Sequence, residues 1–500
     1  MDVMEGETGR PDYLKYDDVE LLNRMDAEYL VQHLTLFPIE QIGSRKWLTQ
    51  HANLEKLNLQ KTGNSSTEGK AFTARGKLNL TKRRMVCQAH YNTMVHNDEF
   101  VMVALTSHDK LGLLIHELLV IEIWKEKVLP HILKALAEQP SNINIHLVLY
   151  QETTIVNLLE VILFHREVCE AMDADSLLEL TDYCYRKLVY LNTQGAEDAA
   201  YKERSGKAIS EMLPEEDLQE KAAGMEFGVA VCSISILRYL TDYMGALPLS
   251  VMARMLDCHD IIMALVPLVE NPPWNRKRTR SGKPVLEKYA EGKWTEVSGS
   301  DRFRLMKPDA QLWLCIYNLI VDKRCRLKYN YDDFRRSQVL KLRKYLNNLL
   351  VDQLPVLKDL KWAVEQLAIQ VPQTGVESAS GRLIIEQVPE LREKLMAKNN
   401  WRVIAQKQLQ SVFSEASSAT QREAQEMLRL FQFGELMEQP TCAACKKAAV
   451  QRCSRCKSEW YCGRECQVSV WKMHKGACDI LAGKVEKSGV AQADISLDPT

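Results

Sequence analysis

Eight cysteine and histidine side chains between residues 442 and 478 constrain this sequence more than any other feature. Their spacing is C-x2-C-x7-C-x2-C-x5-C-x3-C-x7-H-x3-C, so each has a neighbour close enough in the chain to bind the same ion. A single CxxC pair would be weak evidence, whereas four ligand pairs in series predict two zinc sites. The predicted ligands are Cys442, Cys445, Cys453, Cys456, Cys462, Cys466, His474 and Cys478.

The short spacers between these pairs predict that the two sites interleave, because seven or five residues are too few for independent cores. The first and third pairs would then share one zinc ion, bound by Cys442, Cys445, Cys462 and Cys466. The second and fourth would share the other, bound by Cys453, Cys456, His474 and Cys478. Four protein ligands close each site, so both zinc ions are expected to be structural.

The other seven of the fourteen cysteines are scattered, which is typical of buried thiols rather than of disulfides. The first residues are acidic and contain no apolar signal-peptide core, and no stretch approaches the roughly 18 apolar residues of a membrane helix. The net charge of -1 argues against general affinity for nucleic acid or membranes. We therefore expect a soluble protein of a reducing compartment, with no nucleic acid and no membrane as partner.

Residues 1–438 are predicted to form a large helical region. The sequence there is rich in Leu, poor in Gly and almost free of alternating β-branched runs, which favours an α-solenoid or an irregular bundle. Ser176 to Glu179 has the form of a capping box, followed by apolar residues at helical spacing. A second apolar stripe runs from Val339 to Leu349, before Pro355. The predicted fold class is mostly α, with a small cross-braced zinc finger at 442–478.

Three segments depart from the helical pattern. Residues 61–97 carry seven Lys or Arg against one acid, so they predict an exposed insertion. Residues 271–300 predict a long loop or a short hairpin, whose basic run at 275–280 is either a solvated loop or a nuclear localisation signal. Residues 487–500 predict a disordered tail.

Signatures of catalysis are missing from the sequence. It contains no G-x-x-x-x-G-K-[ST], no G-x-G-x-x-G and no H-E-x-x-H motif. The ten histidines outside the cluster have no evident ligand set around them. We therefore expect that the protein is not an enzyme.

The order of the ligands, with Tyr461 before the fifth and Trp471 shortly before the only histidine, resembles the MYND zinc finger. A RING finger fits poorly, because its first linker is longer and its histidine comes earlier. The resemblance implies a protein-interaction module that binds short, extended, proline-containing peptides. It places a peptide groove on Ser454, Gln467 and Trp471, and the alternative role of Trp471 is packing over the zinc core.

Four stretches extend the resemblance to a family of MYND-finger proteins that assist the assembly of axonemal dynein. They are residues 51–58, 237–242, 352–355 and the finger segment 452–462. This resemblance implies a non-enzymatic cytoplasmic scaffold or co-chaperone adaptor for preassembly of the dynein arms of motile cilia. The finger would dock a leucine-rich-repeat dynein assembly factor. The helical region would hold axonemal dynein chains as clients, with a heat-shock chaperone and an immunophilin-type co-chaperone.

The same resemblance implies a location in the cytoplasm, at centriolar satellites or in the apical cytoplasm of ciliated cells. Residues 61–97 have no counterpart in the family, which indicates an unusual transcript or gene model. The main alternative is a nuclear corepressor adaptor, because other MYND fingers recruit repression complexes. A SET-MYND methyltransferase is a weaker alternative, because the finger in those enzymes interrupts the catalytic domain.

Overall fold

The computed structural model describes residues 22, 24–59, 99–137, 143–195, 214–280, 283–290, 292–369, 387–397 and 399–413 before the finger. Within the finger it describes residues 442, 444–445, 451–453, 460–471 and 474–475. The chain divides into two compact units, Met1–Gln421 and Arg422–Thr500, here named the helical unit and the finger unit. The predicted insertion at 61–97 and the predicted tail at 487–500 lie outside the described residues.

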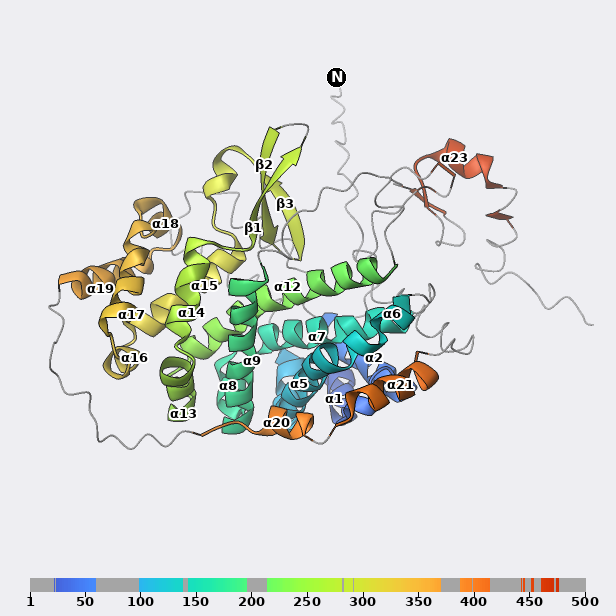
Figure 1. Ribbon diagram of the computed structural model, residues 1–500, viewed down its shortest axis with the longest axis horizontal. Helices are drawn as coiled ribbons and strands as arrows, with labels where there is room; N and C mark the ends of the chain where they lie inside the picture. Colours follow the sequence, from blue (N-terminus) through green and yellow to red (C-terminus); the bar gives the residue numbers. More distant parts are fainter. Residues whose placement is uncertain are drawn as a thin grey trace, which may run out of the picture. The chain divides into compact units, whose positions relative to one another are not determined.

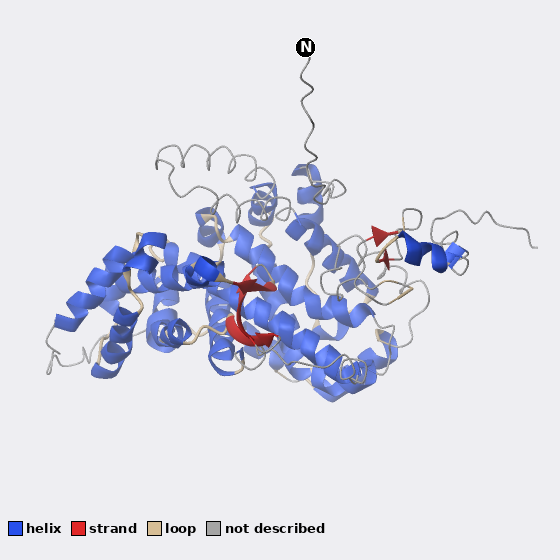
Figure 2. Cartoon of the chain, turned by 90° about the horizontal axis from the view of Figure 1, so that it is seen from above, coloured by secondary structure: helices blue, strands red, loops and turns tan. Residues whose placement is uncertain are grey.

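Helices dominate the described part of the helical unit, which confirms the predicted mostly α fold class (Figure 1, Figure 2). The elements before the sheet are α1 (Arg24–Gln32), η1 (Ile39–Gln41), α2 (Arg45–Leu59), α5 (Leu111–Lys127), α6 (Leu129–Ala137), α7 (Ile143–Ile162), α8 (Arg166–Ala171), α9 (Ala174–Thr193), α12 (Pro214–Asp242), α13 (Leu249–Ala253), η2 (Arg254–Cys258) and α14 (Ile261–Glu270).

A small sheet separates these helices from a second helical series. Its strands are β1 (Asn275–Arg280), β2 (Lys283–Ala290) and β3 (Lys293–Val297). The elements after it are η3 (Gly299–Phe303), α15 (Lys307–Val321), α16 (Lys323–Lys328), α17 (Asp333–Leu340), η4 (Lys341–Lys344), α18 (Asn348–Gln353), α19 (Leu357–Ile369), α20 (Leu391–Met396) and α21 (Trp401–Ser411).

The long helix α12 connects the two series, because it packs against α7 and α9 as well as against α15 (Figure 1). Its stretch Leu218–Asp242 is long and apolar enough to cross a membrane, with a mean hydropathy of 1.3. The expectation that no stretch approaches this composition is therefore wrong. However, 67% of its most apolar part is buried inside the protein. The apolar composition is thus explained by packing in the core.

The apolar stripe predicted in α9 is confirmed as core, but the predicted helix start is wrong. Asp173 is the N-cap, and its Oδ1 accepts a hydrogen bond from Ser176 N at 2.8 Å. Ser176 therefore lies inside the helix, because the earlier aspartate already satisfies the free N–H groups of the first turn. The stripe residues are buried: Leu177, Leu180, Cys184, Leu188 and Leu191.

The stripe predicted between Val339 and Leu349 does not form one continuous helix. The chain instead forms α17, the 3-10 helix η4 and α18 in succession. Asn347 caps α18, because its Oδ1 accepts a hydrogen bond from Leu350 N at 3.0 Å. This new helix start places Leu349 off the stripe, where its side chain is half exposed. The other three stripe residues are buried as predicted: Val339, Leu342 and Leu346.

The segment 271–300 contains a three-stranded antiparallel sheet. The predicted long loop is therefore wrong, and the alternative prediction of a hairpin is right for two strands but missed the third. The strand order is β1-β2-β3. Tyr289 and Trp294 are paired across β2 and β3, and both rings contact Phe227 of α12. β1 was not predicted as a strand, because its sequence is basic and typical of an exposed loop. In the sheet, Glu287 of β2 lies opposite Arg276 of β1.

Helices α20 and α21 return to the N-terminal part of the helical unit (Figure 1). Arg392 of α20 donates hydrogen bonds to Glu122 and Glu126 of α5, at 3.3 and 2.6 Å. Gln408 of α21 is buried, accepts a hydrogen bond from Trp124 Nε1 at 2.8 Å and donates one to Ile39 O at 2.9 Å. These two helices therefore complete a core that begins at η1.

A buried cluster of charges lies between α5, α7, α9 and α12. Glu152 is 2.5 Å from Lys125 Nζ and 2.8 Å from Lys187 Nζ, and it accepts a hydrogen bond from Tyr183 Oη at 2.6 Å. Glu226 contacts both lysines as well. Burial disfavours the charge on Glu152, but the two lysines outweigh this effect and hold its pKa well below its usual range. The four helices thus share a closed ion network in the core.

Candidate metal centre

A short hairpin positions the predicted zinc ligands of the finger unit. β4 (Gln451–Arg452) and β5 (Trp460–Tyr461) pair in antiparallel fashion, with Gln451 opposite Tyr461. β4 leads directly into Cys453, and β5 leads directly into Cys462. Because the strands run in opposite directions, these two ligands lie at opposite ends of the ladder. The hairpin therefore separates one ligand of each predicted set.

The structure brings together the first and third predicted pairs. Their four sulfur atoms, from Cys442, Cys445, Cys462 and Cys466, all lie within 4.8 Å of one another. The Sγ atoms of Cys445 and Cys462 are 3.4 Å apart, and those of Cys462 and Cys466 are also 3.4 Å apart. A tetrahedral zinc ion with Zn–S bonds of about 2.3 Å requires sulfur atoms about 3.8 Å apart. The four residues therefore fit one closed zinc site.

Two residues of the second predicted set also lie close together. His474 Nε2 is 3.4 Å from Cys453 Sγ, and both side chains are buried. Cys456 and Cys478 lie outside the described residues. The described ligands thus follow the interleaved order, because Cys453 lies in the sequence between Cys445 and Cys462 of the first set, yet its sulfur lies beside His474.

The protein surroundings shift the pKa values of two thiols of the first set, Cys442 and Cys466, in opposite directions. Burial disfavours the Cys442 thiolate, but the backbone N–H groups of Cys445, Cys462 and Ala444 outweigh burial and lower its pKa to about 6. Hydrogen bonding with the sulfur of Cys462 is the main effect that raises the pKa of Cys466 to about 12. A bound zinc ion would displace the remaining protons, because thiolate is the form that ligates metal.

Two of the three predicted groove residues, Gln467 and Trp471, lie among the described residues. Gln467 lies on α23 (Arg464–Ser469), and both Gln467 and Trp471 are half-buried. Trp471 packs against the small core of the finger, with its ring centroid 5.7 Å from that of His474. This contact supports the packing role of Trp471, and its groove role stays a prediction. Ser454 lies outside the described residues.

The central role of Tyr461 in the finger was not predicted from the sequence. Its side chain is fully buried in a cluster with Cys442 and Cys453, one ligand from each predicted set. An aromatic ring in this position packs against a ligand of each predicted site and excludes water from both. The signal in the sequence was an aromatic residue directly before the fifth predicted ligand.

Comparison with known proteins agrees with this geometry. The family profile of the MYND finger matches residues 442–478. A zinc finger MYND domain-containing protein 10 homolog from Drosophila melanogaster is 27% identical, and the alignment covers 92% of this chain and 99% of that protein. No solved structure matches the chain. The resemblance predicted from the sequence is therefore confirmed: the chain carries a MYND finger and is similar along nearly its whole length to a protein of this kind.

Proposed function

We propose that this protein is a cytoplasmic, non-enzymatic scaffold or co-chaperone adaptor for the preassembly of axonemal dynein arms. The MYND finger and the similarity over 92% of the chain support an adaptor or scaffold role. The cluster of four cysteine sulfurs carries the proposal. A site closed by four protein ligands stabilises an interaction module and leaves no coordination position for a substrate.

Two structural zinc ions would hold the finger. The first fits the four clustered cysteines, and the second would take Cys453 and His474 with Cys456 and Cys478. The described core of the finger has only three fully buried members, Cys442, Cys453 and Tyr461. So small a core contributes little hydrophobic stabilisation, whereas structural zinc supplies roughly 10–16 kcal/mol. The zinc ions would therefore fold the surface that binds the partner.

The proposed role divides between the two units. The finger would bind a leucine-rich-repeat assembly factor through Gln467, Trp471 and Ser454. The helical unit would hold axonemal dynein chains, together with a heat-shock chaperone and an immunophilin-type co-chaperone. A large helical surface suits such clients, because partly folded chains expose apolar segments that need an extended binding partner.

The position of the basic run at 275–280 supports the cytoplasmic location over the nuclear alternative. Arg276 and Arg278 pair with Glu287 at 2.8 and 3.2 Å. The Arg276 guanidinium also lies 4.0 Å from the ring centroid of Trp294. Recognition of a localisation signal requires basic side chains that are free in an extended segment. In β1 two of these side chains are already engaged within the sheet.

Removal of the protein from multiciliated cells tests the proposal. We expect the cells to build cilia of normal length that lack dynein arms and beat poorly, with dynein heavy chains becoming unstable in the cytoplasm. Normal axonemal dynein content, or a protein found chiefly on chromatin, would contradict this function.

Rescue with a finger variant tests the division between the units. Full-length Cys462→Ala removes a ligand of the clustered site, and we expect it to lose the leucine-rich-repeat partner. The same variant should still co-purify with dynein chains and chaperones. Loss of both groups of partners would show that the helical unit does not act independently of the finger.

A further inference from the structure

The second helical series of the helical unit, together with the sheet before it, is strongly basic. Residues 272–369 contain 21 Lys or Arg against 11 Asp or Glu, a net charge of +10, although the whole chain has a net charge of -1. Like charges gathered in one part of a protein create a field that attracts partners of the opposite sign. An acidic partner is therefore favoured for this part of the molecule.

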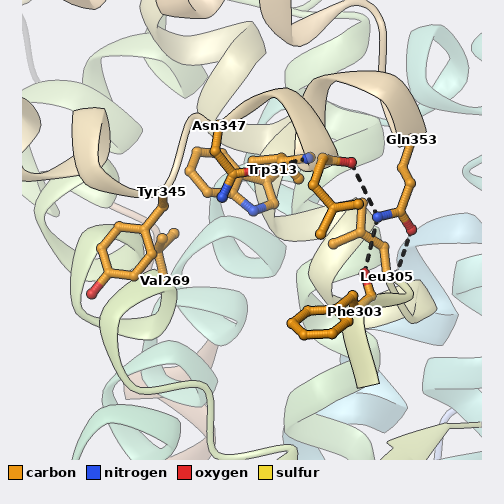
Figure 3. A pocket seen from close by; sticks show the side chains of 9 residues that line it. Val269, Phe303, Leu305, Trp313, Tyr345, Asn347 and Gln353 are labelled. Atoms are coloured by element: carbon orange, nitrogen blue, oxygen red, sulfur yellow. Dashed lines mark hydrogen bonds between the residues drawn. The ribbon is translucent and has the colours of Figure 1, made fainter. Parts of the chain in front are cut away.

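Hydrogen bonds hold this series in one arrangement. A cavity of about 170 Å³ lies beside Trp313 of α15, with walls from α14, η3, α15 and α18 (Figure 3). Gln353 Nε2 donates a hydrogen bond to Phe303 O at 3.0 Å, and Gln353 Oε1 accepts one from Leu305 N at 2.9 Å. This carboxamide ties α18 to η3 and the residues after it. The cavity has no charged residue in its lining, so the charge of the series lies on its other surfaces.

Acidic side chains offset much of the positive charge on the helices after α15. Lys328, the last residue of α16, lies 2.7 Å from Asp257. Arg335 of α17 lies 2.6 Å from Asp260. Two further pairs are Lys341 with Glu270 and Arg343 with Glu365. Paired side chains of this kind contribute little to the attraction of a partner, because each has a neighbouring charge of opposite sign.

Three basic side chains of α16 have no such acidic neighbour. Lys323, Arg324 and Arg326 are exposed, and they form no ion pair within the described part of the chain. The acidic residue directly before them, Asp322, caps α16. Its Oδ1 accepts hydrogen bonds from Arg324 N at 2.8 Å and from Cys325 N at 3.2 Å. The carboxylate is thus bound to the backbone, and α16 presents a surplus of positive charge to solvent.

Helical spacing places these three side chains around one exposed leucine. Residues three and four apart are neighbours on the surface of a helix. Lys323 is thus a neighbour of Arg326 and Leu327, and Arg324 is a neighbour of Leu327 as well. Leu327 is 73% exposed, whereas Cys325 is 1% exposed and fixes α16 to the core. Lys323, Arg324, Arg326 and Leu327 are here named the α16 surface.

We propose that the α16 surface binds an acidic segment of a partner protein. Carboxylates of that segment pair with Lys323, Arg324 and Arg326, and one apolar side chain packs on Leu327. Guanidinium groups suit this role, because they bind a carboxylate through two parallel hydrogen bonds. The leucine adds the apolar contact found at the centre of protein interfaces. The proposed function assigns no residue of the helical unit to a partner, so failure of this site leaves that function untouched.

The size and surroundings of the α16 surface favour a protein segment over a nucleic acid. A helix of six residues is only about 9 Å long. A nucleic acid carries phosphates at intervals of a few ångströms along its whole length, so it would extend past α16. Asp332 and Asp333 follow shortly after α16, are exposed and would repel its phosphates. A short segment with a few carboxylates needs contact with α16 alone.

Fluorescence anisotropy on the full-length, zinc-loaded protein at low salt tests this site. The probe is a short fluorescein-labelled peptide with one Leu flanked by Glu and Asp. Matched peptides replace the acids by Gln and Asn, or the Leu by Ala. We expect the acidic peptide to bind at least about tenfold more tightly than the amide peptide, because each exposed ion pair contributes a factor of up to about five. Salt at about 0.5 M should remove this difference, because it screens exposed charges within a few ångströms.

Charge reversal locates the binding on the protein. The double variant Lys323→Glu with Arg326→Glu should weaken the acidic peptide at least about tenfold. The matched control is Lys358→Glu with Lys361→Glu on α19. These two lysines have the same spacing, lie in the same basic series and form no ion pair among the described residues. Both double variants change the net charge equally, so the control reports the general field and should weaken the peptide less than about twofold.

A neutral variant tests the apolar contact. Leu327→Ala keeps every charge of α16 and should remove the preference for the Leu peptide over the Ala peptide. Ile369→Ala is its control, because Ile369 is 74% exposed and lies on α19, outside the α16 surface. The control should keep the preference. Leu327→Ala still tests the site if the charge-reversed protein fails to fold.

Several results would overturn the proposal. They are no binding of the acidic peptide, equal binding of the acidic and amide peptides, equal binding of the Leu and Ala peptides, or equal loss in the two double variants. A single-stranded oligonucleotide and vesicles of phosphatidylserine with phosphatidylcholine serve as competing probes. Tighter binding of either probe, lost on charge reversal in α16, would identify a nucleic acid or an anionic membrane as the occupant. Self-association of the free protein that the same variant removes would identify a second copy of the chain.

Discussion

The buried ion network provides the sharpest test of how the helical unit is held together. Glu152→Gln keeps the shape of the side chain but removes its charge, leaving Lys125 and Lys187 with Glu226 alone. Glu152 is fully buried, whereas the Glu226 side chain is 22% exposed. Breaking a buried ion pair by removing one partner typically costs about 3–5 kcal/mol, because it leaves an uncompensated charge in the core. We expect a loss of unfolding free energy of this size.

Guanidinium unfolding of the full-length protein, followed by far-UV circular dichroism, measures this loss. Glu365→Gln is the matched control, because Glu365 pairs with Arg343 at 2.8 Å on the surface. An exposed pair of this kind contributes at most about 1 kcal/mol. The two variants remove the same charge by the same substitution, so their difference reports the effect of burial.

The pH dependence of the difference between wild type and Glu152→Gln follows from the lowered pKa of Glu152. A carboxyl group with a folded-state pKa below its unfolded value of about 4.3 binds fewer protons in the folded state. Its contribution to stability is therefore present above that value and is lost as the pH falls through the folded pKa. We expect the full difference at pH 7 and a progressively smaller one below about pH 4.

A Glu152→Gln protein whose unfolding free energy lies within about 1 kcal/mol of wild type at pH 7 would contradict this expectation. Equal losses in Glu152→Gln and Glu365→Gln would contradict it as well. Either result would mean that water or a rearranged Glu226 compensates the lysines, so the network would not be closed.

Three further predictions concern the backbone, the metal and a second buried carboxyl group. Gly43→Ala should weaken the packing of α21 by a few kcal/mol, because φ is +79° at Gly43 and a Cβ there would lie 2.6 Å from Val412 Cγ1. Gly292 has a similar φ of +78° but no atom within 4 Å of such a Cβ. Gly292→Ala should therefore lower the unfolding free energy by only about 1–2 kcal/mol. Hydrogen exchange in residues 401–411 measures the weakened packing of α21 in Gly43→Ala, and thermal unfolding compares the stability of Gly43→Ala with that of Gly292→Ala. Equal losses of stability in the two variants would contradict the steric contact with Val412. Metal analysis should find two zinc ions per chain in wild type and fewer in Cys462→Ala, with the midpoint of helical unfolding unchanged; a single ion in wild type would contradict the two-site interpretation. Burial raises the pKa of Glu55 to about 7. The stability that its neutral form contributes is therefore full below the unfolded pKa and is lost as the pH rises through 7. Glu55→Gln stays neutral at every pH, so it should stabilise the protein above pH 7 by up to about 3 kcal/mol relative to wild type. Parallel pH profiles of the two proteins between pH 5 and 8 would contradict this assignment.

The zinc finger was predictable because metal ligation is a local property of the chain. Ligands a few residues apart must share an ion whatever surrounds them, so the spacing of Cys442, Cys445, Cys462 and Cys466 already implied the cluster that the structure contains. Helical periodicity is local as well, and the buried stripe of α9 followed from it. The role of Tyr461 was less accessible, because its contacts with Cys442 and Cys453 form only after the hairpin has closed.

The errors in the helical unit arose where one local signal competed with another. Asp173 precedes Ser176 and caps α9 first. Asn347 starts a new helix and moves Leu349 to the surface, although the apolar period continues through it. The sheet after α14 was not predicted because β1 is basic on both faces, and only the pairing with β2 brings Glu287 opposite Arg276. Strand pairing is a contact between segments, and no period within one segment reports it.

Contacts between distant segments account for the remaining features. A lysine or glutamate within a helix usually indicates an exposed position, yet Lys125, Glu152, Lys187 and Glu226 meet in the core because four separate helices bring them together. The cavity beside Trp313 likewise needs four segments and the bridging carboxamide of Gln353. Spacing along the chain defines which ligands and periodic faces exist, but burial depends on the three-dimensional packing of elements that the chain itself keeps far apart.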